Sequence, residues 1–468
     1  MPESGSRRKK ALIFIDFDAL VRHFVMSGAF ADLERDFDVV YVVHDDPASP
    51  KKTFTVDLTQ YVDRKVRVCP VPRKRMGLWH LLYIANVLRL HRGRTSYAHR
   101  RLLSVQQIGE WRTRLFEMLS RPGIYQIYRV AFIAAMGCDP AVEALVDDEK
   151  PDVIVQPSFL TGPFVNELMR VSAKRRIPYM LLMNSWDNPA TKAVCTGDPD
   201  RLVVWGEQSK RQAVEYMGVD PGRVVAFGAA QFDVYRTPPC QSHAALAAEF
   251  GVPADRKIVV YAGSGAGWYE SAYLERIDRM TLPGGPLEDC HILYRPHPWR
   301  GPLGNGERDF FEMSFSNVTM DPHMREHYLR QVRQTGGRGM YLLDYQITNR
   351  LLTLASAVVS PLSTILLEAA LMGRPILIFA PPRDLKLDVD KNQPHFRDLV
   401  DWPEVNRCFD DHGFEAACSA LRAQIGNDAV AAALRERSHD FVILDGPTYA
   451  QRLAAEAAAL TAGRECGS

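Results

Sequence analysis

Features that would assign a function directly are scarce in this chain of 468 residues. Its eight cysteines include no Cys-x-x-Cys pair and have no regular spacing, which indicates buried thiols in a reducing compartment rather than a disulfide framework or a zinc site. The formal net charge is only +1, so the composition does not favour nucleic acid as a partner. No run reaches the about 18 apolar residues of a membrane span, and residues 11–15 are too few for a signal-peptide core. We therefore expect a soluble, cytoplasmic protein.

Motifs for common cofactors are missing as well. The turn Gly263-Ser264-Gly265 is not followed by the Gly-Lys-Ser/Thr of a nucleotide-binding Walker loop, nor by the second strand and acid of a dinucleotide fingerprint. The second half of the chain has no suitably placed Asp-x-Asp triad for a metal. We expect neither a resident cofactor nor a required metal ion, because a helix N-terminus, an Arg and a His can together neutralise a diphosphate.

Short apolar runs alternate with helical patterns along most of the chain, and 46% of the residues are hydrophobic, which suffices for large cores. This alternation predicts parallel strands with right-handed crossovers. The expected strands are residues 11–15, 39–43, 152–155, 179–183, 202–205, 224–228, 258–262, 290–294, 340–343, 357–360 and 375–379. A linker with Pro238-Pro239 separates two sets of units. We predict an α/β protein with two Rossmann-like domains facing a cleft: residues 1–235, and residues 236–468 including the terminal helix.

Two motifs of the second half follow expected strands: Arg295-Pro296-His297-Pro298, and Ser360 to Thr364 running into Glu368. Ligands of doubly wound sheets bind outside the carboxyl ends of the strands. An Arg, a His, hydroxyls and a helix N-terminus would suit a phosphate pair. These motifs predict an enzyme that binds a nucleotide monophosphate or diphosphate and transfers the group attached to it.

Each predicted ligand residue also has a structural interpretation. His297 is predicted to contact a phosphate; otherwise it is a partly buried His bonded to a carbonyl. Ser363 and Thr364 are predicted to bind an anion with the first turn of the next helix, but both also suit an ordinary N-cap. Gly263, Ser264 and Gly265 would let the backbone approach a pyrophosphate, although a glycine-rich turn alone is weak evidence.

The base that activates an acceptor is expected in the first half. Asp187 follows a strand and is our first candidate, and Asp16, at the end of the first strand, is the second. His23, one turn into the next helix, is a further candidate. The structural alternative for Asp16 and Asp18 is a pair of turn acids that cap this helix.

Residues 73–130 contain 12 Lys or Arg and only two acids, a local net charge of +10, with Trp and Tyr interleaved. The pattern predicts a basic helical insert. Its surface could meet an anionic membrane leaflet, which would place the protein at the inner membrane as a peripheral protein, or an anionic acceptor. The alternative is a solvated basic face on packed helices.

Four signatures in this order give the chain a family resemblance, from about residue 11 to the last helix. They are Trp205-Gly206-Glu207 with Gly228 to Asp233; Tyr261 to Ser264; Arg295 to Pro298; and Ser363-Thr364 with Glu368-Ala369 and Gly373-Arg374-Pro375. The chain resembles the two-Rossmann (GT-B) glycosyltransferases, above all the bacterial surface-polysaccharide transferases and the CDP-glycerol glycerophosphotransferase-like proteins.

The resemblance implies a glycosyltransferase of cell-envelope or capsule biosynthesis. It would move a sugar from a nucleotide-sugar donor, UDP-linked or CMP-linked, to a saccharide or lipid-linked acceptor without a metal. His297 would contact the donor phosphate, Arg295 would assist it, and Glu368 would bond the ribose hydroxyls. Glycerophosphotransferases tend to have Asp-Tyr-Ser-Ser where this chain has Ser360-Pro361-Leu362-Ser363-Thr364, which favours a sugar over glycerol phosphate.

Three alternatives remain open at this point. The first is a CDP-glycerol-type glycerophosphotransferase. The second is an enzyme like UDP-N-acetylglucosamine 2-epimerase, which the basic insert argues against. The third is a non-catalytic two-Rossmann scaffold that binds partners through its basic face.

Overall fold

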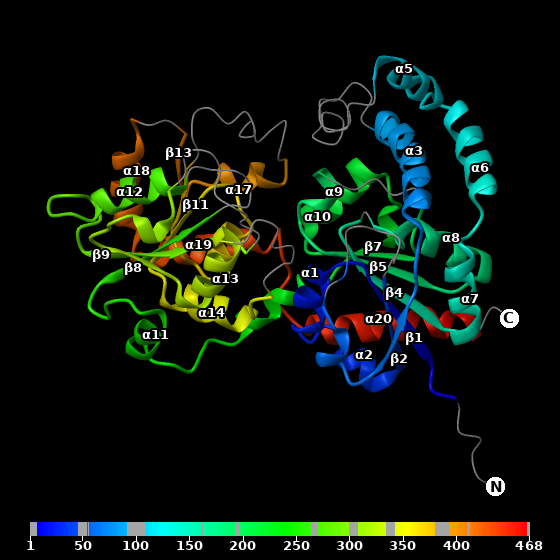
Figure 1. Cartoon of the computed structure of the whole chain (residues 1–468), viewed down its shortest axis with the longest axis horizontal. Coiled ribbons are helices and arrows are strands. Elements are labelled where there is room, and N and C mark those ends of the chain that lie inside the picture. The colour runs from blue at the N-terminus through cyan, green and yellow to red at the C-terminus, as the bar shows by residue number, and fades with distance from the viewer. Residues whose placement is uncertain are drawn as a thin grey trace, which may run out of the picture. The chain divides into compact units, whose positions relative to one another are not determined.

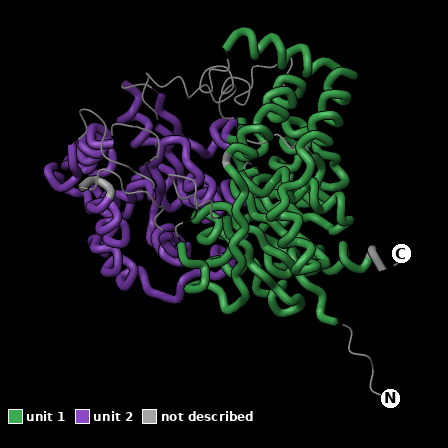
Figure 2. The backbone as a smooth tube through the Cα atoms, turned by 45° about the vertical axis from the view of Figure 1, so that its right-hand side comes forward, with its two compact units in different colours: residues 1–233, 390–395, 440–468 green, residues 234–389, 396–439 purple. Residues whose placement is uncertain are grey.

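The structure is a computed structural model. It describes residues 7–44, 54, 56–90, 109–160, 162–191, 197–263, 270–298, 308–333, 342–379, 394–409 and 412–465. The chain divides into two compact units, coloured separately in Figure 2. Unit 1 consists of residues 1–233, 390–395 and 440–468, and unit 2 of residues 234–389 and 396–439.

Unit 1 is built on a parallel sheet of seven strands in the order β3-β2-β1-β4-β5-β6-β7. The strands are β1 (Lys10–Ile15), β2 (Asp38–Val43), β3 (Lys65–Val68), β4 (Val153–Ser158), β5 (Tyr179–Met183), β6 (Arg201–Val204) and β7 (Val224–Ala226). The central strands are buried almost throughout, as expected for a parallel sheet covered on both faces. Strand order reverses between β1 and β4, and this switch point is where such sheets bind ligands.

Short helices connect these strands (Figure 1). They are α1 (Asp18–Leu20), the π-helix η1 (Val21–Val25), α2 (Ala31–Asp36), η2 (Leu58–Gln60), α7 (Pro140–Glu149), α8 (Val165–Arg175), α9 (Asn188–Thr191), α10 (Glu207–Gln212), η4 (Ala213–Met217) and η5 (Pro221–Arg223), with η6 (Ala230–Arg236) at the unit boundary. The start of α7 shows how local sequence sets them. The Asp139 carboxylate accepts hydrogen bonds from the N–H groups of Ala141 and Val142, and Pro140 has the backbone angle that a first helical position needs.

Unit 2 contains a parallel sheet of six strands in the order β10-β9-β8-β11-β12-β13. The strands are β8 (Lys257–Ala262), β9 (Cys290–Arg295), β10 (Val318–Met320), β11 (Ala357–Ser360), β12 (Ile376–Phe379) and β13 (Val405–Cys408). The helices are α11 (His243–Phe250), α12 (Glu270–Met280), η7 (Phe310–Glu312), α13 (Pro322–Arg333), α14 (Tyr345–Leu354), α15 (Ile365–Leu371), η9 (Pro394–Phe396, at the unit boundary), α17 (Arg397–Val400), α18 (Phe414–Gln424) and α19 (Asp428–Ser438). The switch point lies between β8 and β11.

The predicted fold class, an α/β chain with two Rossmann-like sheets, is confirmed. One predicted strand is wrong, because Leu342 and Leu343 lie in no strand; the other two residues of that stretch lie outside the described ranges. Three strands were missed: β3, β10 and β13. All three are short edge strands, which bury fewer side chains and therefore lack the long apolar runs by which the inner strands were recognised.

The C-terminal segment belongs to unit 1, whereas we expected the terminal helix in the second domain. Helix α20 (Tyr449–Glu465) contacts α2 and β4. The residues before it are held by backbone hydrogen bonds, from Ile443 N–H to Trp205 O at 3.0 Å and from Gln208 N–H to Asp440 O at 2.9 Å. The chain therefore crosses from unit 2 back to the first sheet at its end, a long-range return that has no local sequence signal.

Residues 73–90 and 109–136 contribute a helical insert to unit 1, drawn beyond the sheet in Figure 1. Helices α3 (Arg73–Leu90), α5 (Glu110–Leu119) and α6 (Ile124–Met136) enclose a small apolar core with Trp79, Leu88, Phe116 and Tyr125 among its members. No helix within the described ranges is long and apolar enough to cross a membrane.

The buried Glu167 of α8 fastens this insert to unit 1. Its carboxylate accepts hydrogen bonds from Arg75 at 2.5 and 3.0 Å, from the Trp79 indole at 2.6 Å and from the Asp139 N–H at 2.9 Å. A buried carboxylate is tolerated only with partners of this kind.

We expect Glu167→Gln to lower the free energy of unfolding by about 1–3 kcal/mol, because the charge-assisted bonds weaken and donors are left facing an amide. Urea unfolding followed by circular dichroism measures the change. Glu143→Gln, which removes surface ion pairs with Lys174 and Arg175, should cost less than about 1 kcal/mol. Equal losses in the two variants would contradict an anchoring role for Glu167.

Candidate functional site

Asp16 directly follows β1 at the switch point of the first sheet and is fully buried, at 0% exposure. Its Oδ2 accepts a hydrogen bond from Gln156 Nε2 at 3.0 Å. The Tyr179 hydroxyl in turn donates to Gln156 Oε1 at 2.5 Å, which orients the amide nitrogen toward Asp16. Three neighbouring strands therefore supply one chain of polar groups that ends on the Asp16 carboxyl.

The other carboxyl oxygen of Asp16, Oδ1, has no hydrogen-bond partner among the described residues. Burial raises the pKa of Asp16 well above its ordinary value, and the Gln156 hydrogen bond opposes this only in part. A buried polar atom without a partner is costly, and such groups are concentrated at functional sites. Asp16 thus combines raised basicity with an oxygen available to a proton.

His23 lies in the π-helix η1, a distortion that occurs frequently at functional sites. Its Nδ1 is 2.5 Å from Asn184 Oδ1, at the end of β5. Burial, together with the positive charge of Arg22, lowers the pKa of His23 to about 3, against the opposing effect of the Asn184 hydrogen bond. The ring is therefore neutral near pH 7, with the hydrogen on Nδ1 and Nε2 as the acceptor nitrogen.

Asp187, our first candidate for the base, lies just before α9. Its Oδ1 accepts from Asn188 Nδ2 at 3.3 Å and its Oδ2 from Thr191 Oγ1 at 3.0 Å. Its backbone carbonyl also accepts the Thr191 N–H at 2.9 Å. Both carboxylate oxygens are therefore bonded to side chains of the short helix α9, which suits a structural role. The structure therefore favours Asp16 over Asp187 as the base, and both assignments remain predictions.

The loop after β4 contains a strained residue close to the switch point. Leu160 has φ +61°, an unusual value for a bulky residue, and its N–H bonds Ser158 Oγ at 3.0 Å. Backbone strain of this kind is retained where the surrounding structure enforces it, commonly near binding sites.

In unit 2, Arg295 ends β9 and is almost fully buried. Its guanidinium donates to Asp321 Oδ2 at 3.1 Å and to Thr348 Oγ1 at 2.8 Å. Burial raises the pKa of Asp321 and the Arg295 charge opposes that rise. Two of the Arg295 nitrogens are thus used to join β9, β10 and α14, which suits a residue that positions this edge of the sheet.

His297 lies two residues beyond β9 and is half-buried. The following residue, Pro298, accepts a hydrogen bond through its carbonyl from His327 Nε2 at 2.6 Å. Burial lowers the pKa of His327, so its ring is neutral and the hydrogen lies on Nε2. His327 therefore holds the turn that carries His297, a support from α13 that no sequence motif indicated.

Ser363 and Thr364 lie between β11 and α15, as the motif predicts. Thr364 is the N-cap residue of α15, but its side chain makes no capping hydrogen bond. The alternative of an ordinary side-chain cap is therefore not realised at Thr364. Ser360 is buried, and its hydroxyl already donates a hydrogen bond to Ala262 O at 2.9 Å, between the neighbouring strands β11 and β8.

Glu368 lies one turn into α15 and is 7% exposed. The Tyr235 hydroxyl donates to Glu368 Oε2. Burial and the nearby Glu368 charge raise the pKa of Tyr235, so this phenol is protonated and serves as the donor. Any contact of Glu368 with a ribose must use its other oxygen or displace Tyr235.

Gly263 follows β8 and packs against a buried carboxylate that sequence reasoning missed. A methyl group at Gly263 would lie 2.5 Å from Glu270 Oε1, and the Tyr294 hydroxyl donates to Glu270 Oε2. The absence of a side chain at Gly263 thus allows its backbone to lie close to the Glu270 carboxylate, at the start of α12. Ser264 and Gly265, the other residues of the predicted cradle, lie outside the described residues.

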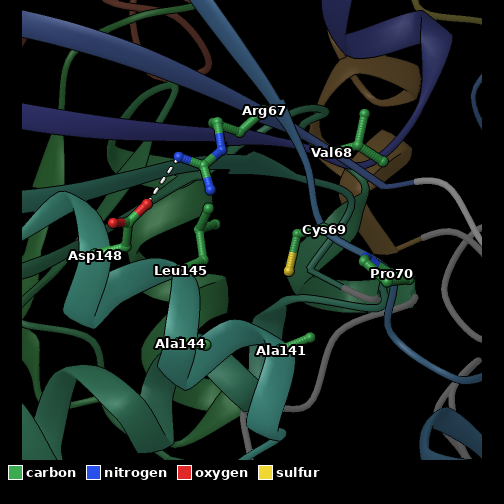
Figure 3. A pocket seen from close by; sticks show the side chains of 8 residues that line it. All are labelled: Arg67, Val68, Cys69, Pro70, Ala141, Ala144, Leu145 and Asp148. Atoms are coloured by element: carbon green, nitrogen blue, oxygen red, sulfur yellow. Dashed lines mark hydrogen bonds and ion pairs between the residues drawn. The ribbon is translucent and has the colours of Figure 1, made fainter.

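A shallow cavity of about 310 Å³ lies at the edge of the first sheet, between the end of β3 and α7 (Figure 3). Arg67 and Asp148 form an ion pair of 2.9 Å at its rim, and Cys69 and Leu145 face it. None of its lining residues belongs to a predicted motif. In the ranges that the structure describes, no group of three or more His, Cys, Asp or Glu side chains is arranged to hold a metal ion.

Comparison with known proteins gives few matches in sequence and many in structure. No protein-family model matches the chain. A stretch of 117 residues is 28% identical to the D-inositol 3-phosphate glycosyltransferase of Kineococcus radiotolerans and covers 23% of this chain and 24% of that enzyme.

Solved structures align over most of the chain. The glycosyltransferase of kitacinnamycin is 14% identical, with 97% of this chain and 99% of that chain covered and a TM-score of 0.48. The Anabaena protein HepE, solved with UDP and glucose, is 13% identical, with 96% and 99% covered and a TM-score of 0.46. A putative UDP-N-acetylglucosamine 2-epimerase from Listeria monocytogenes is 12% identical, with 96% and 95% covered and a TM-score of 0.46. At these values the assignment of the fold rests on the two sheets of the chain itself.

Proposed function

We propose that the chain is a glycosyltransferase that moves a sugar from a nucleotide-activated donor to a surface-polysaccharide or glycoconjugate acceptor without a metal ion. The observation that carries the proposal is Asp16: a buried carboxyl at a sheet switch point, with a raised pKa and one oxygen without a partner in the described structure. Such a group suits a general base near neutral pH. The short match to a D-inositol 3-phosphate glycosyltransferase agrees with this class of reaction.

In the proposed step an acceptor hydroxyl attacks the anomeric carbon of the donor sugar. The bond from that carbon to the donor phosphate oxygen breaks, the new glycosidic bond forms, and Asp16 takes the hydroxyl proton. Unit 1 supplies this acceptor chemistry. Gln156 positions the carboxyl through its hydrogen bond, and neutral His23 with Asn184 provides a polar wall at the same edge.

Unit 2 is the proposed donor unit. His297, Ser363 and Thr364 follow β9 and β11, where the phosphates of a nucleotide would receive hydrogen bonds as negative charge develops on the leaving group. Arg295 positions this edge through Asp321 and Thr348. We place the reaction in the cytoplasm, at the inner leaflet of the membrane.

The first test is thermal unfolding of the full-length protein with UDP, CMP, CDP, GDP and ADP, each with and without magnesium. A nucleotide present at about a hundred times its dissociation constant should stabilise the protein by about 2.7 kcal/mol. That corresponds to a melting temperature higher by roughly 5–10 °C. We expect one base to be preferred and EDTA to change nothing. Stabilisation by none of the five, or only with magnesium, would contradict the proposal.

His297→Ala should lower the rate of donor turnover at least about tenfold, because the leaving phosphate loses a donor that strengthens in the transition state. Turnover is measured as release of the nucleotide product. His243→Ala, at an exposed position on α11, is the matched control and should leave turnover unchanged. Near-normal turnover in His297→Ala would remove this residue from the site.

A further inference from the structure

Two helices of the insert expose large apolar side chains to solvent. We call these six residues the insert surface; their exposed fractions are Trp111 67%, Leu115 39%, Met118 45%, Ile124 39%, Ile127 74% and Val130 66%. They are six of the thirteen exposed large hydrophobic residues identified within the described ranges, gathered into 20 consecutive positions. Single exposed apolar residues need no explanation, but such a concentration indicates a binding surface.

The spacing shows that the insert surface belongs to one side of each helix. On α5 the three residues recur at steps of four and three, and on α6 at steps of three, so each set forms one stripe. The opposite sides are buried, through Phe116 of α5 and Tyr125 of α6, in the core shared with α3. These helices are therefore apolar on two sides, and only one of those sides is needed for folding.

Charge next to the insert surface is mainly positive. Residues 110–136 contain four Arg and two Glu, and Arg129 is the only charged residue of α6. In the sequence the longer segment 73–130, part of which lies outside the described ranges, has a net charge of +10. Arg side chains beside exposed aliphatic residues and a Trp are the composition of helices that lie in a membrane interface, because the apolar side chains enter the acyl boundary while the guanidinium groups reach anionic headgroups. Binding of an apolar protein partner would not explain this excess of positive charge, whereas binding of an anionic membrane does.

We propose that α5 and α6 form an interfacial membrane-binding surface, in which Trp111, Ile127 and Val130 enter the headgroup region of a bilayer rich in anionic lipid. The proposed binding is to one leaflet, and no helix in the described ranges is long and apolar enough to span a bilayer. Helix α3 links this membrane-binding surface to the sheet of unit 1, because Arg75 and Trp79 donate hydrogen bonds to the buried Glu167 of α8. The attachment is to helix α8 of the unit that carries Asp16, and the membrane proposal does not depend on the proposed sugar transfer.

The test is co-sedimentation of the full-length protein with vesicles of phosphatidylcholine, with and without phosphatidylglycerol, at about 0.1 M and about 1 M NaCl, where the screening length falls from about 10 to about 3 Å. We expect at least about tenfold tighter binding to the anionic vesicles at low salt and loss of most of that preference at high salt. The double variant Ile127→Ser/Val130→Ser should bind anionic vesicles at least about tenfold more weakly. Arg112→Gln/Arg121→Gln should lose roughly fivefold per charge and become less sensitive to salt.

Val68→Ser is the matched control, because Val68 is 59% exposed on β3, in the same unit and outside the insert surface. It should bind vesicles like the unchanged protein. Thermal unfolding with and without nucleotide verifies that every variant is folded, and it separates failure of this proposal from failure of the proposed function. No vesicle binding by the unchanged protein at low salt would overturn the proposal, as would undiminished binding by the Ile127→Ser/Val130→Ser variant. A dimer in light scattering that this variant abolishes, without vesicle binding, would assign the insert surface to a second copy of the chain instead.

Discussion

Asp16→Asn should lower sugar transfer by about 10²–10⁴-fold, the usual contribution of a positioned general base. The amide keeps the shape of the side chain and can still accept the hydrogen bond from Gln156, whose orientation Tyr179 sets. What it loses is the ability to take a proton. The loss should therefore fall on the rate constant of transfer, with donor binding unchanged in the thermal-shift assay.

The same substitution should stabilise the protein near neutral pH. Because burial raises the pKa of Asp16 in the folded state, the folded protein favours the neutral carboxyl. The contribution of Asp16 to the free energy of unfolding is fully present below the pKa that it has in the unfolded chain, about 3.9. This contribution is lost as pH rises through the higher pKa of the folded state. The Asn variant carries no such charge, so its advantage in unfolding free energy should be small near pH 4 and grow as pH rises. Transfer by the unchanged protein should rise over the same range, as Asp16 ionises.

Asp187→Asn is the control that separates the two candidates for the base. If Asp187 only supports α9, this variant should keep transfer within about tenfold and lose up to about 2 kcal/mol of stability, because its hydrogen bonds with Thr191 and Asn188 weaken. Initial rates and urea unfolding across a pH series measure both effects. A large loss of transfer in Asp187→Asn, with Asp16→Asn nearly active, would reverse the assignment.

Gly228→Ala should destabilise the protein by about 3–5 kcal/mol, the largest loss of stability that we predict. Gly228 has φ +94°, and a methyl group there would lie 2.1 Å from the carbonyl oxygen of Ile443. The substitution adds the cost of a disfavoured backbone conformation to a clash with backbone that cannot move alone. Because Ile443 leads into α20, the clash should release the C-terminal segment from unit 1.

Thermal unfolding should show this as a melting temperature lower by roughly 10 °C, and limited proteolysis as early cleavage after residue 440. Gly28→Ala is the matched control, because Gly28 also lies in unit 1 at positive φ, +74°, but has nothing within 4 Å of the added methyl group. It should lose only about 1–2 kcal/mol. Similar losses in the two variants would show that backbone strain alone, without the contact to Ile443, explains Gly228.

This contact also explains part of the family resemblance. The glycines of Trp205-Gly206-Glu207 and Gly228 to Asp233 lie against residues 440–443, where a methyl group on Gly206 would be 2.5 Å from the Phe441 carbonyl carbon. The Asp233 carboxylate accepts the N–H of Tyr449 at 2.6 Å. These two motifs thus hold the returning C-terminal segment in place. This structural contact is sufficient to explain why both motifs are present, without a contact to the nucleotide-sugar donor.

The amino-acid sequence by itself determined the inner strands of both sheets, because a strand buried on both faces needs an unbroken apolar run, as in Ala11 to Ile15 or Ile258 to Ala262. It also determined that Asp16, His297 and Ser363 follow such strands, since alternation alone places these positions at carboxyl ends. The basic insert was visible in the same way, as a local excess of charge.

Only the tertiary structure decided which of the predicted site residues already have hydrogen-bond partners within the protein. The sequence predicts that Arg295 assists a phosphate, but its guanidinium donates to Asp321 and Thr348. The Glu368 carboxylate likewise accepts a hydrogen bond from Tyr235, which is distant in the sequence. The edge strands and the return of residues 440–465 to unit 1 were likewise invisible. The physical reason is common to all of them: hydrogen-bond partners and close backbone contacts are chosen across large sequence separations, whereas apolar periodicity and strand ends are properties of neighbouring residues.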